Sequence, residues 1–192
     1  LTIIDLFSRY GIAIPLPNKS PVAVATALFR HFYTRFGRPR RIMVDRGGEF
    51  INAGIKRMCD MWEIRLVPTT GLQPQALPIE RWHRWLNAAM TGLHARFGGA
   101  WTEYLPAAVF AYNNSIHDST GYTPHELIYR QRPELPADVL FSLSSPARPE
   151  TADDYFCRTA RAMTAMYQHA RRQQRVAAQR NQALRAGRAM KS

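Results

Sequence analysis

Apolar and polar positions along the first third of the chain follow the pattern of short β-strands. The runs LTIID (1–5) and GIAIPLP (11–17) are rich in β-branched and apolar side chains. The polar turn at 7–10 between them indicates a hairpin. RIMVD (41–45) has the composition of a short buried strand that ends on a carboxylate and is followed by glycines. A fourth strand is expected near 64–67.

Between and after these strands, apolar residues recur every three to four positions, which predicts helices. Ser20 and Pro21 form a helix-start signal, and Gly37 supplies the stop of the helix that follows. Further helices are expected over 51–62, 78–97, 101–115 and 123–129, and one long helix from Ala152 onward. Residues 68–78 contain too many Pro, Gly, Thr and Gln residues to continue a strand or a helix, and are expected to form a loop.

The order of these elements, strands first and then strands mixed with helices, favours an α/β class over a helical bundle. The 192 residues, 46% of them hydrophobic, suffice for one ordinary core and an appendage. We therefore expect one domain over 1–135, a Pro-rich linker over 136–150 and a basic helical tail over 151–192.

The chain carries a formal charge of +12, which makes a polyanion its natural partner. The charge is uneven. The tail holds nine basic and two acidic residues, and so contributes seven of the twelve net charges. Such a helix binds DNA or RNA through phosphates, although a solvated helix made of good helix formers has the same composition.

Cys59 and Cys157 are far apart and form no Cys-x-x-Cys motif, which disfavours a disulfide framework or a cysteine-based zinc site and fits a reducing compartment. No apolar run reaches the length of a membrane span, and no signal peptide is visible. The chain opens inside the apolar run Leu1-Thr2-Ile3-Ile4, as expected of a fragment of a longer protein.

Two carboxylates stand out as candidates for chemistry. Asp45 lies at the C-terminal end of a strand and is followed by Arg46 and two glycines, where α/β sheets place ligands. Glu80 lies in the first turn of the helix predicted over 78–97. If the two converge, they suit a hard cation such as Mg²⁺. On pattern alone, the more usual roles are a turn residue for Asp45 and a complement to the helix dipole for Glu80.

Four segments resemble one known family. In order over about 1–140 they are IIDLFSRYGIAIPL, RFGRPRRIMVDRGGEF, ERWHRWLNAAM and WTEYLPAAVFAYNNSIHDSTGYTPHELIYRQRPELP. As a set they resemble the integrase catalytic core of gypsy-type LTR retrotransposons, within the retroviral integrase superfamily. That family also shows a strand ending in Asp-Arg-Gly-x-x-Phe and a helix opening with Glu-Arg. The tail resembles the charged helix that follows this core.

The resemblance implies an RNase H-like mixed sheet flanked by helices, here without its first strand, and followed by the basic helix. Asp45 and Glu80 would be the second and third catalytic carboxylates and would hold Mg²⁺ or Mn²⁺. The first would lie on a strand upstream of Leu1. Asp5 is expected to be a turn residue, because its surroundings resemble the end of the family's second strand.

The segment before Glu80 departs from the family pattern. Gln73 stands where the family has a His before Pro-Gln, and a flexible Gly and one further residue are missing. The 34 residues between Asp45 and Glu80 are one fewer than the family's usual interval. These changes put the mobility of this loop and the pose of Glu80 in doubt, as expected of a decayed element or a copy kept for a non-catalytic role.

Several residues are predicted to contact nucleic acid. On the helix of Glu80, Arg84 and Asn87 follow at i+4 and i+7 and share its face with His83, for which a ligand role is disfavoured. A solvated helix flank is the alternative. Trp82, Trp85 and Trp101 are predicted to pack rather than stack on bases. The full set of predicted nucleic-acid contacts is Arg46, Arg81, Arg84, Asn87, Arg171, Arg172 and Arg175.

The function implied is metal-dependent 3′-end processing and strand transfer of DNA, in which water first nicks the element ends and the freed 3′-hydroxyl then attacks target DNA. The alternative is a decayed or domesticated core that binds nucleic acid without catalysis. A third hypothesis makes the tail the functional part, as a nonspecific RNA-binding helix. Expected partners are element and target DNA, RNA through the tail, and further copies of the chain. The expected location is the nucleus or the element's intracellular particle, not secretion.

Overall fold

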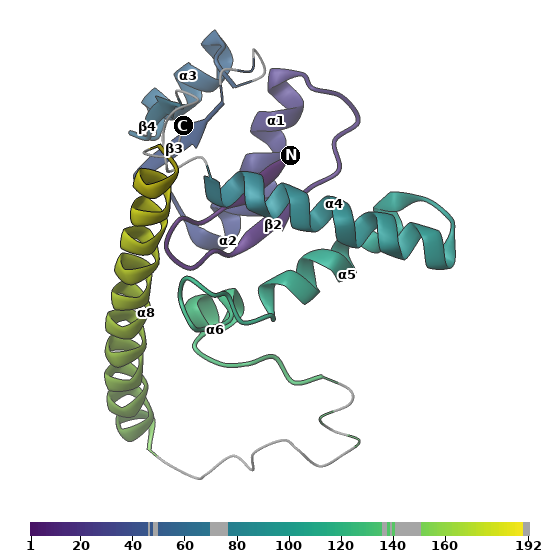
Figure 1. The fold of residues 1–192 in the computed structure, drawn as a ribbon. Coiled ribbons are helices and arrows are strands. Elements are labelled where there is room, and N and C mark those ends of the chain that lie inside the picture. Colours follow the sequence, from purple (N-terminus) through teal and green to yellow (C-terminus); the bar gives the residue numbers. More distant parts are fainter. Residues whose placement is uncertain are drawn as a thin grey trace. The chain divides into compact units, whose positions relative to one another are not determined.

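The computed structural model describes residues 1–45, 47, 50–69, 77–135, 138, 140 and 151–189 (Figure 1). Its elements are β1 (Thr2–Ile4), β2 (Gly11–Ala13), α1 (Pro21–Leu28), the π-helix η1 (Phe29–Tyr33), α2 (Thr34–Phe36), β3 (Arg41–Val44), α3 (Ala53–Met61), β4 (Arg65–Pro68), α4 (Leu77–Phe97), α5 (Trp101–Asn113), α6 (Pro124–Tyr129) and α8 (Ala152–Ala189). They divide into two compact units. Unit 1 comprises Leu1–Ile4 and Ile12–Val109, and unit 2 comprises Asp5–Gly11 and Phe110–Ser192. The domain boundaries expected from the sequence stay a prediction.

The four expected strands all form, as two ladders. β1 and β2 make the predicted hairpin, in which the backbones of Leu1 and Ile14 exchange two hydrogen bonds of 2.8 Å. β3 and β4 pair in parallel, in a register that runs from Arg41↔Arg65 to Val44↔Pro68. The single mixed sheet expected from the sequence is thus divided in two. Among the described residues, each strand uses one of its two hydrogen-bonding edges on a strand partner.

The predicted start and end of the first helix are confirmed. The Ser20 side chain accepts a hydrogen bond from the backbone N–H of Ala23 and caps α1, with Pro21 in the first turn. The helix ends at Gly37, which adopts a φ of +76°. Between α1 and α2 the backbone widens into the π turn η1, which the apolar stripe does not indicate.

The core of unit 1 lies between the first helical segment, α3 and the strands. Its buried members are Val24, Leu28, Tyr33, Ile55, Cys59 and Ile64. Tyr33 stacks on Trp62 with a centroid distance of 5.2 Å. Burial raises the pKa of the Tyr33 hydroxyl to about 12, and the nearby Cys59 thiol adds to the rise. Burial, followed by the charge of Asp60, raises the pKa of the Cys59 thiol.

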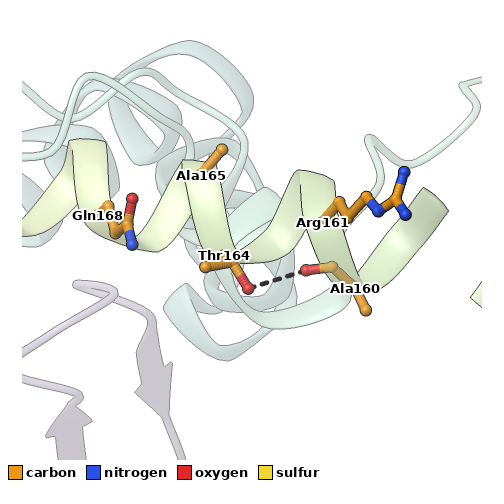
Figure 2. Close-up of a pocket in the computed structure, with 5 residues that line it drawn as sticks. All are labelled: Ala160, Arg161, Thr164, Ala165 and Gln168. Atoms are coloured by element: carbon orange, nitrogen blue, oxygen red, sulfur yellow. Dashed lines mark hydrogen bonds between the residues drawn. The ribbon is translucent and has the colours of Figure 1, made fainter. Parts of the chain in front are cut away.

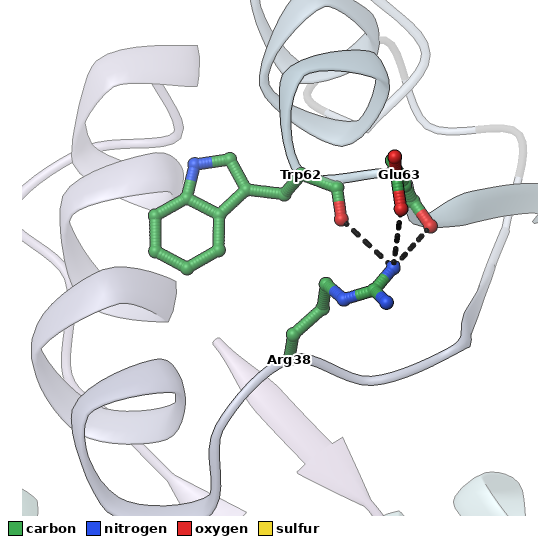
Figure 3. A network of polar contacts seen from close by, with 3 residues as sticks. All are labelled: Arg38, Trp62 and Glu63. Carbon is green, nitrogen blue, oxygen red and sulfur yellow. Dashed lines mark hydrogen bonds and ion pairs between the residues drawn. The ribbon is translucent and has the colours of Figure 1, made fainter.

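Arg38 holds the turn between α3 and β4 (Figure 3). Its Nη1 donates to the carbonyl oxygens of Trp62 (3.2 Å) and Glu63 (2.9 Å), and lies 3.5 Å from the Glu63 carboxylate. Glu63 has a positive φ of 51°, an uncommon conformation for this residue type. Because the carboxylate is exposed, the two carbonyl bonds matter more than the ion pair. They fix the loop that leads into β4.

Unit 2 is organised around buried polar groups. The Asn113 side-chain amide accepts from the Gly11 backbone N–H and donates to the Gly11 carbonyl, both at 2.8 Å. Thr123 and Glu126 form a capping box at the start of α6. Satisfied in this way, the buried polar groups cost little and fix a single backbone arrangement.

The middle of α8 packs against other parts of unit 2. Ala170 is fully buried, and the Tyr167 hydroxyl donates to the Leu127 carbonyl at 3.0 Å. The Tyr167 ring meets the Phe7 ring edge-on, at a centroid distance of 5.3 Å. The Gln174 amide donates to the Phe7 carbonyl. One side of α8 is therefore docked on the rest of unit 2.

Candidate functional site

Asp45 follows the last residue of β3 directly, where Val44 is almost fully buried and pairs with Pro68. The Asp45 carboxylate is exposed, and its Oδ1 accepts a hydrogen bond from the Gly47 backbone N–H at 3.0 Å. This Asx-type turn directs the chain away from the strand. The carboxylate retains acceptor capacity for a further ligand, since an ionised carboxylate has about four lone-pair sites.

Glu80 lies in the first turn of α4 and is exposed. The helix is anchored through its opposite face, because Trp82 is 1% and Leu86 7% exposed. With 3.6 residues per turn, Glu80 shares the outward face with Arg84 and Asn87, which are also exposed. The carboxylate is therefore accessible to solvent with a guanidinium and an amide on the same face.

A hydrogen bond ties this end of α4 to the first strand. The Nε2 atom of His83 lies 2.6 Å from the Thr2 hydroxyl oxygen. His83 is three residues after Glu80, so the bond fixes the helical turn that carries the carboxylate. The sequence disfavoured His83 as a metal ligand but gave no sign of this structural contact.

Asp5 is a turn residue, as predicted. Its Oδ2 accepts hydrogen bonds from the backbone N–H groups of Phe7 (3.2 Å) and Ser8 (2.7 Å) and from the Ser8 hydroxyl (2.8 Å). Three donors on one oxygen hold the hairpin turn in shape, which explains the carboxylate without a metal.

Asp45 and Glu80 belong to the same compact unit. Among the residues that the structure describes, no three His, Cys, Asp or Glu side chains gather in a way that could hold a metal ion. Residues 70–76, in the loop whose sequence departs from the family pattern, lie outside the described residues. Arg46, Gly48 and Glu49 also lie outside them. The convergence of the two carboxylates on one cation stays a prediction.

The predicted nucleic-acid contacts are distributed over both units. Arg81, Arg84 and Asn87 of α4 are exposed, and so are Arg171, Arg172 and Arg175 of α8. Arg171 differs from its neighbours, since its guanidinium carbon lies 5.8 Å from the centroid of the Phe7 ring. It makes a cation–π contact within the docked region of the tail.

The tryptophans divide between packing and exposure. Trp82 is buried, as predicted. Trp101 is 55% exposed, so the packing prediction is wrong for it. It opens α5 after Gly98 and Gly99, whose positive φ values turn the chain between two helices. Phe97, at the end of α4, is 61% exposed. In the part of the chain that is described, no helix is long and apolar enough to cross a bilayer.

Comparison with known proteins tests the resemblance to retrotransposon integrases. Residues 1–74 match the family model of the integrase core domain. The resemblance to retrotransposon integrases is confirmed. A Drosophila melanogaster protein, the retrovirus-related Pol polyprotein from transposon 412, is 29% identical over 137 residues, which cover 71% of this chain and 11% of that protein. The Bos taurus Gypsy retrotransposon integrase-like protein 1 is 23% identical over 132 residues, which cover 69% of this chain and 26% of that protein. The chain thus spans about a tenth to a quarter of these relatives.

Solved structures of integrases share the fold. The catalytic core domain of BIV integrase aligns with a TM-score of 0.57 at 19% identity, over 74% of this chain and 88% of that one. Integrase in the simian T-cell lymphotropic virus intasome, in complex with a PP2A regulatory subunit, gives 0.61 at 18% identity, over 78% and 53%. The HTLV-2 integrase core in complex with magnesium gives 0.55 at 14% identity, over 64% and 79%. The RNase H-like fold expected from the sequence is confirmed.

The matching family model is that of an integrase core domain, and one solved neighbour, the HTLV-2 integrase core, is in complex with magnesium. Asp45 and Glu80 have the chemical type of ligand that such an ion prefers, because both are exposed oxygen donors. Mg²⁺ is commonly bound through one or two carboxylates together with substrate phosphate.

Proposed function

We propose that this chain is the larger part of the catalytic core of a retrotransposon integrase, which processes the 3′ ends of element DNA and joins them to target DNA. The observation that carries the proposal is the position of Asp45 at the end of β3 and of Glu80 in the first turn of α4, within one unit of an integrase-like fold. Each carboxylate is exposed, as a group that acts on a phosphodiester must be.

In this mechanism Asp45 and Glu80 would hold Mg²⁺ or Mn²⁺, which stabilises the charge that develops during an in-line displacement. The chain's own residues position the carboxylates and the DNA. The Gly47 N–H orients the Asp45 carboxylate, and the His83–Thr2 bond fixes the turn that carries Glu80. Arg84 and Asn87, on the Glu80 face of α4, would contact the phosphate backbone.

We further propose that a strand upstream of Leu1 supplies the first catalytic carboxylate and pairs with an unused strand edge of unit 1. The two ladders leave such edges among the described residues, and Asp5 is already engaged in its turn. Arg46, Arg81, Arg172 and Arg175 would add DNA contacts, and further copies of the chain would complete the assembly. The proposed site of action is the nucleus or the element's intracellular particle.

The test is a strand-transfer assay on element-end oligonucleotides in Mn²⁺ or Mg²⁺, with the chain as it stands and with the chain extended by about thirty encoded upstream residues. We expect activity in the extended protein only. Asp45→Asn and Glu80→Gln should each lower it by about two to three orders of magnitude, the scale observed when one group that stabilises a transition state is removed. Asp60→Asn, at an exposed carboxylate of α3, is the matched control.

A non-catalytic nucleic-acid-binding module is the second candidate. It is favoured by the departures from the family pattern before Glu80, where Gln73 stands in place of a His and a flexible Gly is missing. If the extended protein binds DNA but shows no metal-dependent turnover, or if its turnover survives both carboxylate substitutions, the integrase proposal fails and the module is the better account.

A further inference from the structure

The helix α8 has one face that contacts the rest of unit 2. Its less exposed positions follow one another at helical spacing: Met163, Tyr167, Ala170, Gln174 and Ala177 are all buried or partly buried. The contacts of Tyr167 and Gln174 with Leu127 and Phe7 anchor this face. Docking therefore fixes how α8 is rotated about its own axis, and with it the direction of every other side chain on the helix.

A second set of residues lies on the opposite side of the helix, and we call it the outer stripe. Its members are exposed and fall 4, 7, 11, 14 and 18 residues after Arg161, close to whole turns of 3.6 residues. They are Arg161, Ala165, Gln168, Arg172, Arg175 and Gln179. Every long side chain of the outer stripe ends in a hydrogen-bond donor, and three carry a permanent positive charge.

A shallow depression borders the outer stripe at Arg161, Ala165 and Gln168 (Figure 2). Ala160, Thr164 and Ala165 keep the surface low beside Arg161 and Gln168, and the Thr164 hydroxyl turns back to the Ala160 carbonyl at 3.0 Å. A phosphate group at this place would approach the helix closely, with the Arg161 guanidinium and the Gln168 amide as donors.

Arg171 does not belong to the outer stripe. It contacts the Phe7 ring, which also packs against Tyr167 of the docked face. Its charge therefore helps to hold α8 in place, whereas Arg172, one residue later, faces away from the docked side.

The acidic residues of α8, Asp153 and Asp154, lie in its first turn, and none occurs between positions 155 and 189, so no carboxylate lies within the outer stripe. Arg161 and Arg172 are separated by eleven residues, which corresponds to about 17 Å along the helix axis. That distance lets flexible arginine side chains reach phosphates on both sides of a major groove about 12 Å wide. The outer stripe carries no aromatic side chain on which single-stranded bases could stack.

We propose that the outer stripe binds the phosphate backbone of duplex DNA without reading its sequence, and that Arg161, Arg172 and Arg175 carry the contact while Arg171 serves to dock the helix. The choice of DNA rests on the proposed integrase function, but the binding itself requires neither Asp45, Glu80 nor a metal ion. The two proposals can therefore fail separately.

The test measures binding of the full chain to a labelled duplex of about 25 base pairs of arbitrary sequence, in EDTA, over a series of salt concentrations. The triple variant R161Q/R172Q/R175Q should weaken binding by about 10²–10³-fold at 0.1 M salt and reduce the slope of log K against log salt by about 2.7, since each phosphate contact contributes roughly 0.9. A single R171Q substitution should leave the slope within about one contact of the parent and lower the melting temperature instead.

A matched control removes three exposed arginines from unit 1. R30Q/R35Q/R57Q lowers the net charge by the same amount. If this variant loses as much affinity and slope as the stripe variant, total charge and not the outer stripe governs binding, and the proposal is overturned. It is equally overturned if R171Q alone reproduces the loss, or if RNA of the same length binds more tightly and shows the same dependence on the three arginines. Circular dichroism of each variant checks that α8 remains helical.

Discussion

The reactivity of a side chain in this protein depends on its burial as well as on its residue type, as the two cysteines show. Both cysteines are free thiols, yet Cys59 is 1% exposed within the core of unit 1 and Cys157 is exposed on α8. Burial also raises the pKa of the Cys59 thiol, so little of it is thiolate at neutral pH. The thiolate is the reactive form of cysteine. We therefore expect the Cys59 thiol to react with reagents only when the core opens.

We expect one fast and one slow thiol when the native protein reacts with a colorimetric disulfide reagent. Cys157 should react at the rate of an accessible thiol, and Cys59 on the order of a hundredfold more slowly or not at all until denaturant is added. Cys157→Ser should remove the fast phase and Cys59→Ala the slow one. A fast phase that persists in Cys157→Ser would show that the core around Cys59 is open.

At the scale of the element, α8 combines a docked face with an exposed one. A charged side chain is therefore tolerated on the exposed face and destabilising on the docked face. Ala170 is fully buried, whereas Ala165 is exposed on the outer stripe. A charge at position 170 would lose its hydration without gaining a partner, and a charge at 165 would keep its water.

Ala170→Asp should therefore destabilise unit 2 by about 2–4 kcal/mol and make α8 more open to trypsin at Arg171 and Arg172. Ala165→Asp should cost about 0.7 kcal/mol or less, the difference in helix propensity, but should weaken DNA binding because it places a negative charge among the stripe arginines. Denaturant unfolding, limited proteolysis and DNA titration distinguish the two. Equal losses of stability in both variants would contradict the described docking of α8.

The elements themselves could be predicted from the sequence because their signals are local. Ser20, Gly37 and Thr123 cap or end helices through bonds that span at most four residues. The features that could not be predicted from the sequence depend on contacts between residues far apart in the chain. The division of the sheet in two is set by strand pairing. The exclusion of Arg171 from the outer stripe depends on which side of α8 docks against Phe7.

The candidate site follows the same rule. The positions of Asp45 after a strand and of Glu80 in a helix's first turn are local, and both predictions are confirmed. Their separation depends on the path between β4 and α4, which no local signal determines. The periodicity of α8 did contain one unused signal, because Arg161 falls in phase with Arg172 and Arg175.

At the scale of the whole molecule, the exposed aromatic pair at the junction of α4 and α5 bears on assembly. Phe97 and Trp101 are more than half exposed, and the guanidinium of Arg96 lies 5.2 Å from the Phe97 ring centroid. Exposed aromatic residues with an adjacent arginine are typical of the residues that dominate protein interfaces. This surface suits contact with a second copy of the chain.

Trp101→Lys should shift the protein toward the monomer mass of 21.9 kDa in light scattering after gel filtration. Met61→Lys is the control, since Met61 is 74% exposed but stands at the end of α3, away from this pair in the sequence. A parent protein that is already monomeric at tens of micromolar, or an oligomer that Trp101→Lys leaves intact, would contradict this interface.

The wide turn η1 has a consequence for how this part of the fold tolerates changes in length. A π turn holds one more residue than the α-helical turn it replaces. Here it lies between Leu28 and Thr34, in a helix whose Val24 and Leu28, before the turn, and Tyr33, at its end, pack on the same core. Loss of one residue from Phe29–Tyr33 would leave an ordinary α-helix with both ends still in place. Single-residue insertions and deletions among related chains are therefore expected to concentrate in this helix, where they would be absorbed without displacing β3 or the carboxylate that follows it.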